Sequence, residues 1–191
     1  MLNDAERRAI DRLWSRKLEQ DKEGLRQSER HRNLEPDSAE FIHALAAGCG
    51  ARSLLEIGGS SGLSTIALAA AARSTSGRLM SIEIEPARQQ EARTTLRALH
   101  TADYVEFVLG DARDHLRKVG PFDFVLIDCE KDDYAPFFDM LRLQPGGVVV
   151  ADNILSHNLW DYVRHVRSKS AVASVTLPIG KGLEVSRVEK S

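Results

Sequence analysis

The stretch SLLEIGGSSGLST, residues 53–65, decides the fold because it joins a buried strand, a glycine turn and the start of a helix. In such a turn the backbone N–H groups at the start of the helix can closely approach a bound ligand. The stretch therefore predicts a nucleotide-type binding site. A tight strand-to-helix turn also needs glycine for conformational reasons alone, so a purely structural origin stays open.

Short apolar runs alternate with helical patterns from Arg52 onward. The runs expected as strands are SLLEIG, RLMSIEIE, YVEFVLG, FDFVLID and GGVVVAD, with helices from Leu63, from Pro86, around His115 and from Tyr134. Five strands that alternate with four helices imply a parallel sheet with right-handed crossovers. Beyond them a helix near residues 159–167 precedes ASVTLPIG and GLEVSRV, which a Gly-Lys-Gly turn joins into a hairpin. We expect an α/β fold with a mostly parallel, doubly wound sheet and a C-terminal antiparallel hairpin.

The length and charge of the chain describe one ordinary domain over residues 1–191. With 191 residues, 42% of them hydrophobic, the chain can bury one core but is too short for two domains of normal size. A net charge of -2 gives no field that gathers nucleic acid. Cys49 and Cys129 have no metal-ligand spacing and suit a reducing compartment. With no apolar signal core or membrane-length run, we expect a cytoplasmic protein.

The N-terminal segment, residues 1–35, is rich in charged side chains and carries a narrow apolar stripe. Its apolar residues near helical spacing are Ile10, Leu13, Trp14, Leu18 and Leu25. This spacing predicts one amphipathic helix over residues 4–32. The stripe suits docking on the domain, pairing with a second subunit or framing a ligand. A second helix is expected from Pro36 to a stop at Gly48.

An acidic residue ends the strand that follows the glycine turn. Glu83 comes about 20 residues after Gly62, where a carboxylate can accept hydrogen bonds from ribose hydroxyls. The spacing of the glycines in the turn does not match G-x-G-x-x-G, so a dinucleotide is disfavoured. Glu56, inside the first strand, suits a ligand that bears positive charge. Alternatively, Glu56 is a strand-end carboxylate that nearby backbone N–H groups satisfy.

Two acidic residues and an asparagine end two other strands. Asp128 ends FDFVLID, and Asp152 and Asn153 end GGVVVAD, so all three should emerge at the carboxyl edge of the sheet beside the glycine turn. Two carboxylates and one amide carbonyl make a hard site suited to Mg²⁺, Mn²⁺ or Ca²⁺. The Asp152-Asn153 pair equally suits a turn in which both side chains bond to local backbone. Lys131 can reach a hydroxyl bound at this edge, or it is a solvated loop lysine.

Four motifs in matching order carry a family resemblance. The pattern E-x-G-x-x-x-G-x-S, formed by Glu56, Gly58, Gly62 and Ser64, resembles the cofactor motif of cation-dependent catechol and caffeoyl-CoA O-methyltransferases, which use S-adenosylmethionine (SAM). IDCEKDDY, ADNI and LPIGKGLEVSR resemble the family's Asp-Lys-Tyr segment, its Asp-Asn metal pair and its closing hairpin. The resemblance implies the Rossmann-like class I methyltransferase fold.

The resemblance also implies a role for each matching residue. In the cofactor site, Glu56, the Gly58–Gly62 turn and Ser64 would lie at the methionine part of SAM and Glu83 at the ribose. The residues expected against the adenine are Asp111, Ala112 and Arg113, although Asp111 also reads as the N-cap of a short helix. The residues implied as ligands of a divalent cation, usually Mg²⁺, are Asp128, Asp152 and Asn153. Asp128 would also border the cofactor, and Lys131 would be the general base.

Departures from the family pattern narrow the expected substrate. Only residues 154–176 separate Asn153 from LPIG, a shorter insertion than plant caffeoyl-CoA enzymes carry, which disfavours a bulky CoA thioester. We therefore expect methyl transfer to a hydroxyl of a small catechol-like phenol, with no membrane partner and nucleic acid disfavoured. A homodimer is compatible with the N-terminal helix.

Three alternatives stay open. Related bacterial proteins methylate a hydroxylated uridine in transfer RNA, and a basic groove near Arg164, Arg167 and Lys169 would favour that substrate. A nicotinamide-dependent oxidoreductase is disfavoured by the glycine spacing. A non-catalytic module that binds the cofactor is the third alternative.

Overall fold

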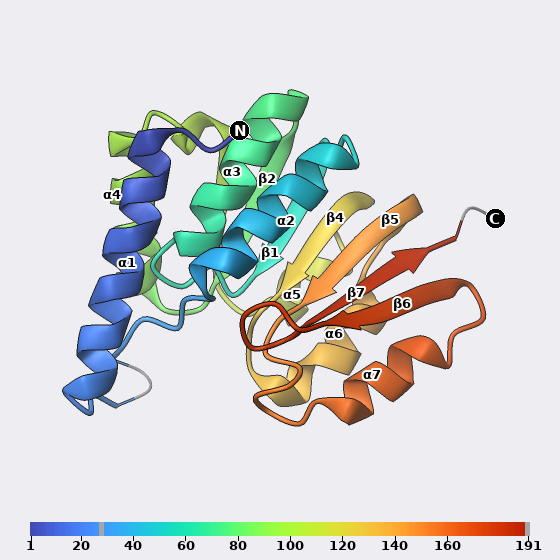
Figure 1. The fold of residues 1–191 in the computed structure, drawn as a ribbon. Helices are drawn as coiled ribbons and strands as arrows, with labels where there is room; N and C mark the ends of the chain where they lie inside the picture. Colours follow the sequence, from blue (N-terminus) through green and yellow to red (C-terminus); the bar gives the residue numbers. More distant parts are fainter. Residues whose placement is uncertain (27–28, 190–191) are drawn as a thin grey trace.

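A seven-stranded sheet forms the middle layer of the protein (Figure 1). The computed structural model describes residues 1–26 and 29–189, and its strand order is β3-β2-β1-β4-β5-β7-β6. The strands are β1 Ser53–Ile57, β2 Arg78–Glu83, β3 Val105–Leu109, β4 Phe122–Ile127, β5 Leu143–Ala151, β6 Val172–Leu177 and β7 Leu183–Val188. Neighbours among β1 to β5 pair in parallel, whereas β7 is antiparallel to β5 and β6. The expected mostly parallel sheet with a C-terminal antiparallel hairpin is therefore confirmed.

Helices cover both faces of this sheet. They are α1 Asp4–Lys22, α2 Pro36–Gly48, α3 Leu63–Thr75, α4 Pro86–Ala98, α5 Arg113–Leu116, α6 Tyr134–Met140 and α7 Trp160–Arg167, with short 3₁₀ turns η1 Ala102–Tyr104 and η2 Lys131–Asp133. Helices α1 to α4 lie on one face and α5 to α7 on the other (Figure 1). The strands alternate accordingly: Phe124 and Leu126 of β4 join the first core, while Val125 and Ile127 join the second.

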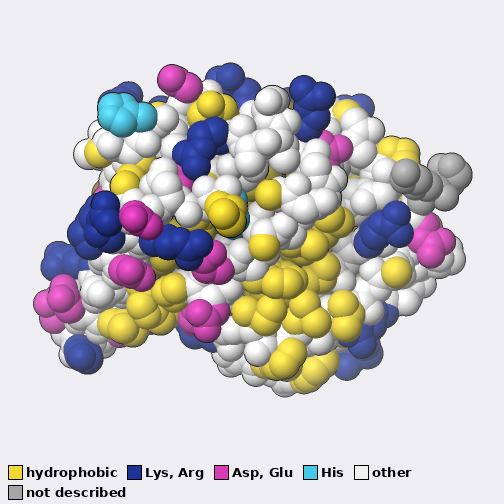
Figure 2. Space-filling model, turned by 45° about the horizontal axis from the view of Figure 1, so that its top comes forward, with side chains coloured by type: hydrophobic (Ala, Val, Ile, Leu, Met, Phe, Trp, Pro, Cys, Tyr) yellow, Lys and Arg dark blue, Asp and Glu magenta, His cyan; other side chains and the backbone are white. Residues whose placement is uncertain are grey.

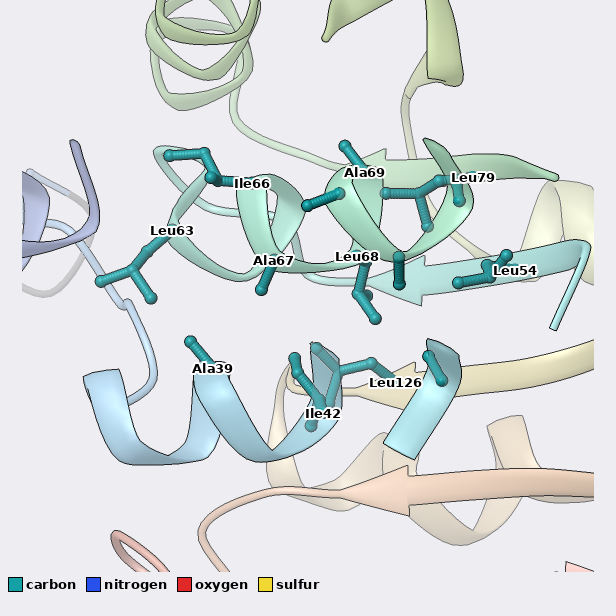
Figure 3. Packing of buried hydrophobic residues seen from close by; sticks show 14 of the residues in the cluster. Ala39, Ile42, Leu54, Leu63, Ile66, Ala67, Leu68, Ala69, Leu79 and Leu126 are labelled. Atoms are coloured by element: carbon teal, nitrogen blue, oxygen red, sulfur yellow. The ribbon is translucent and has the colours of Figure 1, made fainter. Parts of the chain in front are cut away.

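Helix α3 is the centre of the first core. Every residue from Leu63 to Ala72 is buried, and half of them are alanines. Because alanine side chains are small, α2 can approach α3 closely; Figure 3 shows Ala39 and Ile42 of α2 facing Ala67 and Leu68 of α3. This packing holds the start of α3, and with it the glycine turn, rigidly against the sheet.

Helix α1 begins as the sequence predicts but ends earlier. A capping box formed by Asn3 and Glu6 starts it, because each side chain accepts a hydrogen bond from the other residue's backbone N–H. The prediction of one helix over residues 4–32 is wrong, since α1 ends at Lys22 and Gly24 turns the chain with a φ of +68°.

The docking role expected for α1 is confirmed. Ile10 and Leu13 are buried in the core cluster that contains α3. The buried carboxylate of Glu6 also accepts a hydrogen bond of 3.1 Å from Nη2 of Arg73 on α3. These contacts fix the direction in which α1 runs, and therefore where its last turn lies.

The surface mixes both signs of charge. On the face drawn in Figure 2, basic and acidic side chains are interspersed around one area where hydrophobic side chains gather. That face therefore carries no broad basic surface. Among residues 1–26 and 29–189, none of the helices has the length and apolar character that a membrane span needs.

Candidate functional site

Two cavities open at the carboxyl edge of the parallel strands, and both are lined by Asp128 and Arg32. The first, which we call the glycine cavity, is bounded by the glycine turn and the ends of β2 and β3; it includes Gly58, Ser60, Glu83, Asp111, Ala112, Arg113 and Phe137. The second, the lysine cavity, is bounded by α1, the segment after it, and the ends of β4 and β5; it includes Lys17, Asp21, Arg30, Lys131, Asn153, His157 and Lys181. Asp128 therefore stands where the two cavities meet.

The glycine turn is built for close approach of the backbone. Gly58 has a φ of +95°, and a Cβ atom there would lie 2.0 Å from the carbonyl oxygen of Asp128. Gly62 has a φ of +102°, and its Cβ would lie 2.8 Å from that of Ala92 in α4. Both positions need glycine for conformation and for space. The structural origin considered above for these glycines is thus present, together with a cavity beside the turn.

Glu83 faces the glycine cavity, as its predicted ribose role requires. Its Oε2 accepts a hydrogen bond of 2.7 Å from the N–H of Ser60, and its Oε1 accepts one of 2.9 Å from the N–H of Glu85. Arg88 Nη1 lies 3.9 Å from Oε1. An ionised carboxylate has about four acceptor sites, so capacity for ribose hydroxyls is left. The turn and the strand end are thereby held together by one side chain.

The segment predicted to contact adenine lines the same cavity. Asp111, Ala112 and Arg113 all border it, beside the apolar Phe137 of α6. Asp111 also accepts a hydrogen bond of 2.9 Å from the N–H of Arg113, so it supports the start of α5 as well. This backbone hydrogen bond and the Arg113 guanidinium lower the pKa of the Asp111 carboxyl, against the opposing effect of burial.

Glu56 lies beneath the glycine turn, outside the lining of both cavities. It is fully buried, and its Oε2 accepts hydrogen bonds from the hydroxyls of Thr65 (2.6 Å) and Ser81 (2.5 Å). Burial raises the pKa of Glu56, although the hydroxyls of Ser64, Ser81 and Thr65 oppose the shift. This placement favours the strand-end carboxylate interpretation, with side-chain hydroxyls in place of backbone N–H groups. Ser64 is likewise buried and does not line the glycine cavity.

The three residues expected at a metal site do meet at the sheet edge. The N–H of Asp128 donates to Ile57 O (3.0 Å) and that of Asp152 to Ile127 O (3.1 Å), which continues the strand pairing and sets the two acids side by side. Asn153 follows with a φ of +65°, a conformation that asparagine tolerates, and its Nδ2 donates to Oδ1 of Asp128 at 2.8 Å.

The two carboxylates differ in their partners: Asp128 accepts a hydrogen bond from Asn153, whereas Asp152 lacks the partners that buried acids normally have. Asp152 is fully buried, and within the described part of the chain neither of its side-chain oxygens has a hydrogen-bond partner. Burial, and then the charge of Asp128, raises the pKa of Asp152 well above its ordinary value. Burial also raises the pKa of Asp128, with Lys131 and Arg32 opposing. A bound cation would compensate both acids.

The donor set is oxygen-rich but contains few titratable ligands. Among the residues that the structure describes, no three His, Cys, Asp or Glu side chains are grouped so as to hold a metal ion. Asp128, Asp152 and Asn153 supply two carboxylates and one amide. Hard cations such as Mg²⁺ bind oxygen ligands of this kind and keep several waters, so the residues present fit a hard divalent cation.

Lys131 lines the lysine cavity next to Asp128. Its Nζ donates to the hydroxyl of Tyr134 at 2.9 Å and lies 3.6 Å from Oδ1 of Asp128. The Lys131 side chain is 20% exposed, so it is not the freely solvated loop lysine considered as the alternative. Tyr134 is fully buried, and burial raises the pKa of its hydroxyl. A neutral phenol thus positions the amine at the cavity wall.

A segment that carried no recognised motif covers the glycine turn. The N–H of Arg32 donates to Ser60 Oγ at 3.0 Å, and Asn33 Nδ2 donates to Ser61 Oγ at 2.9 Å. This segment, residues 30–35, places Arg32 between the cavities and brings Glu35 to Lys181, 3.0 Å away. The sequence analysis did not single out these residues, nor Lys17 and Asp21, because they lie in a run of charges that predicts one long helix. Lys181 entered it only as the middle residue of the Gly-Lys-Gly turn.

The basic groove considered for transfer RNA is neutralised by acids. Arg164 pairs with Asp161, and Lys169 lies 2.7 Å from Asp139. Arg167 Nε donates to the buried Glu184 at 2.9 Å. Each of these three cations therefore has a carboxylate partner of its own.

Comparison with known proteins assigns the chain to a family. A family model described as "Protein of unknown function (DUF1442)" matches residues 23–191. The chain belongs to this family. The match begins directly after α1 and includes the glycine turn, the acidic strand ends and the C-terminal hairpin.

Curated relatives agree with the resemblance found in the motifs. A catechol O-methyltransferase from Mycobacterium tuberculosis (strain ATCC 25618 / H37Rv) is 39% identical over 120 residues, which cover 61% of this chain and 54% of that protein. Caffeoyl-CoA O-methyltransferase 1 from Eucalyptus globulus is 26% identical over 179 residues, 79% of this chain and 72% of that protein. The chain spans little more than half the length of the first curated relatives that it matches.

Solved structures share the whole fold. The O-methyltransferase TomG from Streptomyces achromogenes, involved in tomaymycin synthesis and solved in complex with SAM, superposes with a TM-score of 0.79. It is 25% identical, and the match covers 99% of this chain and 91% of that one. The Rossmann-like methyltransferase fold expected from the motifs is confirmed, as is the resemblance to catechol and caffeoyl-CoA O-methyltransferases.

Proposed function

We propose that this chain is an O-methyltransferase that uses SAM and a divalent cation to methylate a hydroxyl of a small vicinal dihydroxy aromatic. The single observation that carries the proposal is the meeting of the two cavities at Asp128. Methyl transfer requires a donor and an acceptor side by side. The glycine cavity suits the donor, because it combines the glycine turn, Glu83 and the Asp111–Arg113 segment. The lysine cavity suits the acceptor.

Two buried acids support the divalent cation. A buried carboxylate without a hydrogen bond is costly, and Asp152 is such a carboxylate beside a second one. Asp128, Asp152 and Asn153 would hold the cation, with Mg²⁺ expected from the oxygen ligands and Mn²⁺ or Ca²⁺ as alternatives. When bound, the cation would stabilise negative charge on the acceptor oxygen as a Lewis acid.

The remaining chemistry falls to side chains of the lysine cavity. Lys131, in its neutral form, would take the proton of the acceptor hydroxyl, since its amine lies at the cavity wall beside Asp128. The acceptor oxygen then attacks the methyl carbon of SAM. As the new C–O bond forms, the C–S bond breaks and its electron pair stays on sulfur. Tyr134 would act as a positioning residue that holds the Lys131 amine.

The proposal is tested by incubating the purified protein with SAM and a panel of catechols, with Mg²⁺ or with chelator. Methylated product that mass spectrometry detects only with Mg²⁺ is the expected result. Product at equal rates with chelator would contradict the role of the cation. Tight SAM binding without any product would favour the non-catalytic module, and product only from transfer RNA that carries the hydroxylated uridine would favour the RNA enzyme.

A homodimer, with which the N-terminal helix is compatible, stays an untested alternative to a monomer. Sedimentation velocity over a range of protein concentrations checks it, because the fitted mass of a dimer would be about twice that of the monomer.

A further inference from the structure

The lysine cavity is polar throughout its described lining. Five of its lining side chains are cationic, namely Lys17, Arg30, Arg32, Lys131 and Lys181, and two are acidic, Asp21 and Asp128. Among the residues that the structure describes, no apolar residue lines it, and its only aromatic rings are the imidazoles of His31 and His157. Small-molecule sites are ordinarily mostly apolar with a few polar groups. Arg32, Lys131 and Lys181 each have an acidic partner of their own, namely Glu130, Asp128 and Glu35, whereas Lys17 and Arg30 share one. The end of the cavity that holds Lys17 and Arg30 therefore has more cations than acids.

Two of the cations contact one carboxylate at the end of the cavity formed by α1, and Lys181 acts on the same carboxylate through its charge. Lys17 Nζ lies 2.6 Å from Oδ2 of Asp21, and Arg30 Nη1 lies 3.0 Å from its Oδ1. Burial opposes ionisation of Asp21, but Lys17, Arg30 and Lys181 outweigh it and lower the pKa of the carboxyl. Asp21 alone leaves this end of the cavity with excess positive charge.

Lys181 connects the two ends of the cavity. Its charge lowers the pKa of Asp21 and opposes the burial-driven rise in the pKa of Asp128. It lies in the hairpin turn, 3.0 Å from Oε1 of Glu35. A cation at Asp128 and Asp152 would compensate those acids and leave the lysines and arginines of the cavity with even less negative charge nearby.

The cations at this end of the cavity are partly buried. The Lys17 side chain is 13% exposed and those of Arg30 and Lys181 are each 36% exposed, so an incoming anion would meet partly desolvated cations. Charge-assisted hydrogen bonds gain strength in such surroundings. This geometry suits a compact anion that enters the cavity, whereas a nucleic-acid backbone binds along an open basic surface.

We propose that the acceptor is a vicinal dihydroxy aromatic that carries a carboxylate, which Lys17, Arg30 and Lys181 receive. The inference rests on the proposed function, because it takes the lysine cavity as the acceptor site. It adds the substrate class: an aromatic acid, with its hydroxyls toward Asp128 and its carboxylate toward α1.

A matched substrate pair tests the proposal. The kcat/KM of methyl transfer is measured for 3,4-dihydroxybenzoate and for 3,4-dihydroxybenzamide, which has nearly the same shape but no charge. We expect the acid to be favoured by about tenfold or more, the range of one hydrogen bond between charged groups. Equal values, or preference for the amide, would overturn the proposal.

Variants locate the preference in the cavity. Lys17→Gln and Lys181→Gln should each lower the ratio of acid to amide, and Lys22→Gln, an exposed lysine of α1 outside the cavity lining, should leave it unchanged. Asp21→Asn should raise the ratio, because it removes the competing carboxylate at constant size. If Lys17 had a purely structural role, Asp21→Asn would not raise the ratio of acid to amide. A ratio that neither lysine variant alters would overturn the proposal.

A binding measurement separates this proposal from the proposed function. Both ligands are titrated into the protein with S-adenosylhomocysteine and Mg²⁺ present, and heat is recorded by calorimetry. If no catechol is methylated but the acid binds more tightly than the amide in wild type and not in Lys17→Gln, the proposed reaction fails and the anion site stands. If the acid binds no more tightly than the amide, the anion site fails whatever the activity.

Discussion

Asp152 is one of the three proposed ligands of the cation, and among the described residues its side-chain oxygens have no hydrogen-bond partner. Asp152→Ala should reduce turnover by at least about a thousandfold, because it removes a ligand of the cation that stabilises the acceptor oxygen. It should leave SAM binding measurable, since Asp152 does not line the glycine cavity. Kinetics and calorimetry on the same preparation check both parts. Asp161→Ala, at a carboxylate whose side chain is 95% exposed, is the matched control.

Glu83 combines a structural and a binding role. Glu83→Ala should weaken SAM affinity by about 1.5 to 3 kcal/mol, because a charged acceptor of ribose hydrogen bonds is lost. The N–H groups of Ser60 and Glu85 lose their acceptor in the same change. Calorimetric titration with SAM measures the effect, and Glu106→Ala, at an exposed acid of β3, is the control. An unchanged dissociation constant would refute the ribose role.

Glu56 should govern the pH dependence of stability. Its pKa in the folded protein is raised by burial, so the folded state holds a proton that the unfolded state releases as pH rises above the ordinary carboxyl range. The contribution of Glu56 to the free energy of unfolding is therefore full at acidic pH and lost as pH rises toward its folded pKa. Glu56→Gln should lessen that loss, so its stability relative to wild type should increase between pH 5 and pH 8 in urea unfolding. A parallel pair of curves would contradict the assignment.

The glycine turn links two elements, since the end of β1 and the end of β4 touch there. Gly58→Ala should destabilise the protein by more than about 2 kcal/mol, because its φ is left-handed and the new Cβ would overlap the carbonyl oxygen of Asp128. SAM affinity should fall with it. Gly48→Ala, at the end of α2 where a Cβ meets no atom within 4 Å, should be close to neutral or slightly stabilising. Thermal unfolding of both variants gives the comparison.

Element boundaries show how far the sequence pattern reaches. The predicted stop of α2 at Gly48 and the hairpin turn at Gly180–Gly182 agree with the structure, because glycine and proline act locally. The predicted end of α1 does not agree with the structure. The charged residues 23–32 have a composition typical of a helix, but Gly24 ends the helix. The four-residue helix α5 lies between β3 and β4, and the turn η2 lies between β4 and α6.

For the whole molecule, cation binding should couple to folding. Saturating Mg²⁺ at about a hundred times its dissociation constant should add about 2.7 kcal/mol of stability, or roughly 5 to 10 °C in melting temperature for a chain of this size. In Asp152→Asn the metal-free protein should melt higher than wild type, because a buried charge is gone, and Mg²⁺ should add little. Scanning calorimetry with Mg²⁺ or chelator measures both. A melting temperature of wild type that Mg²⁺ does not change would count against the site.

The sequence by itself determined the order of strands and helices, the glycine turn, and the acidic residues at the strand ends. These features follow from local periodicity and from the fact that parallel strands bring their carboxyl ends to one edge. They were enough to predict that Asp128, Asp152 and Asn153 meet and that Glu83 lies beside the turn. The place of the Asp111–Arg113 segment came from the family resemblance.

Only the tertiary structure decided which side chains surround the acceptor. Lys17, Arg30 and Lys181 are brought to one cavity by helix docking, by the segment that crosses the glycine turn and by the hairpin. Only the structure placed Glu56 beneath the turn, where the hydroxyls of Thr65 and Ser81 both donate to its Oε2. The physical reason is that such contacts join residues far apart in the chain, and packing energy, which no local pattern encodes, selects them.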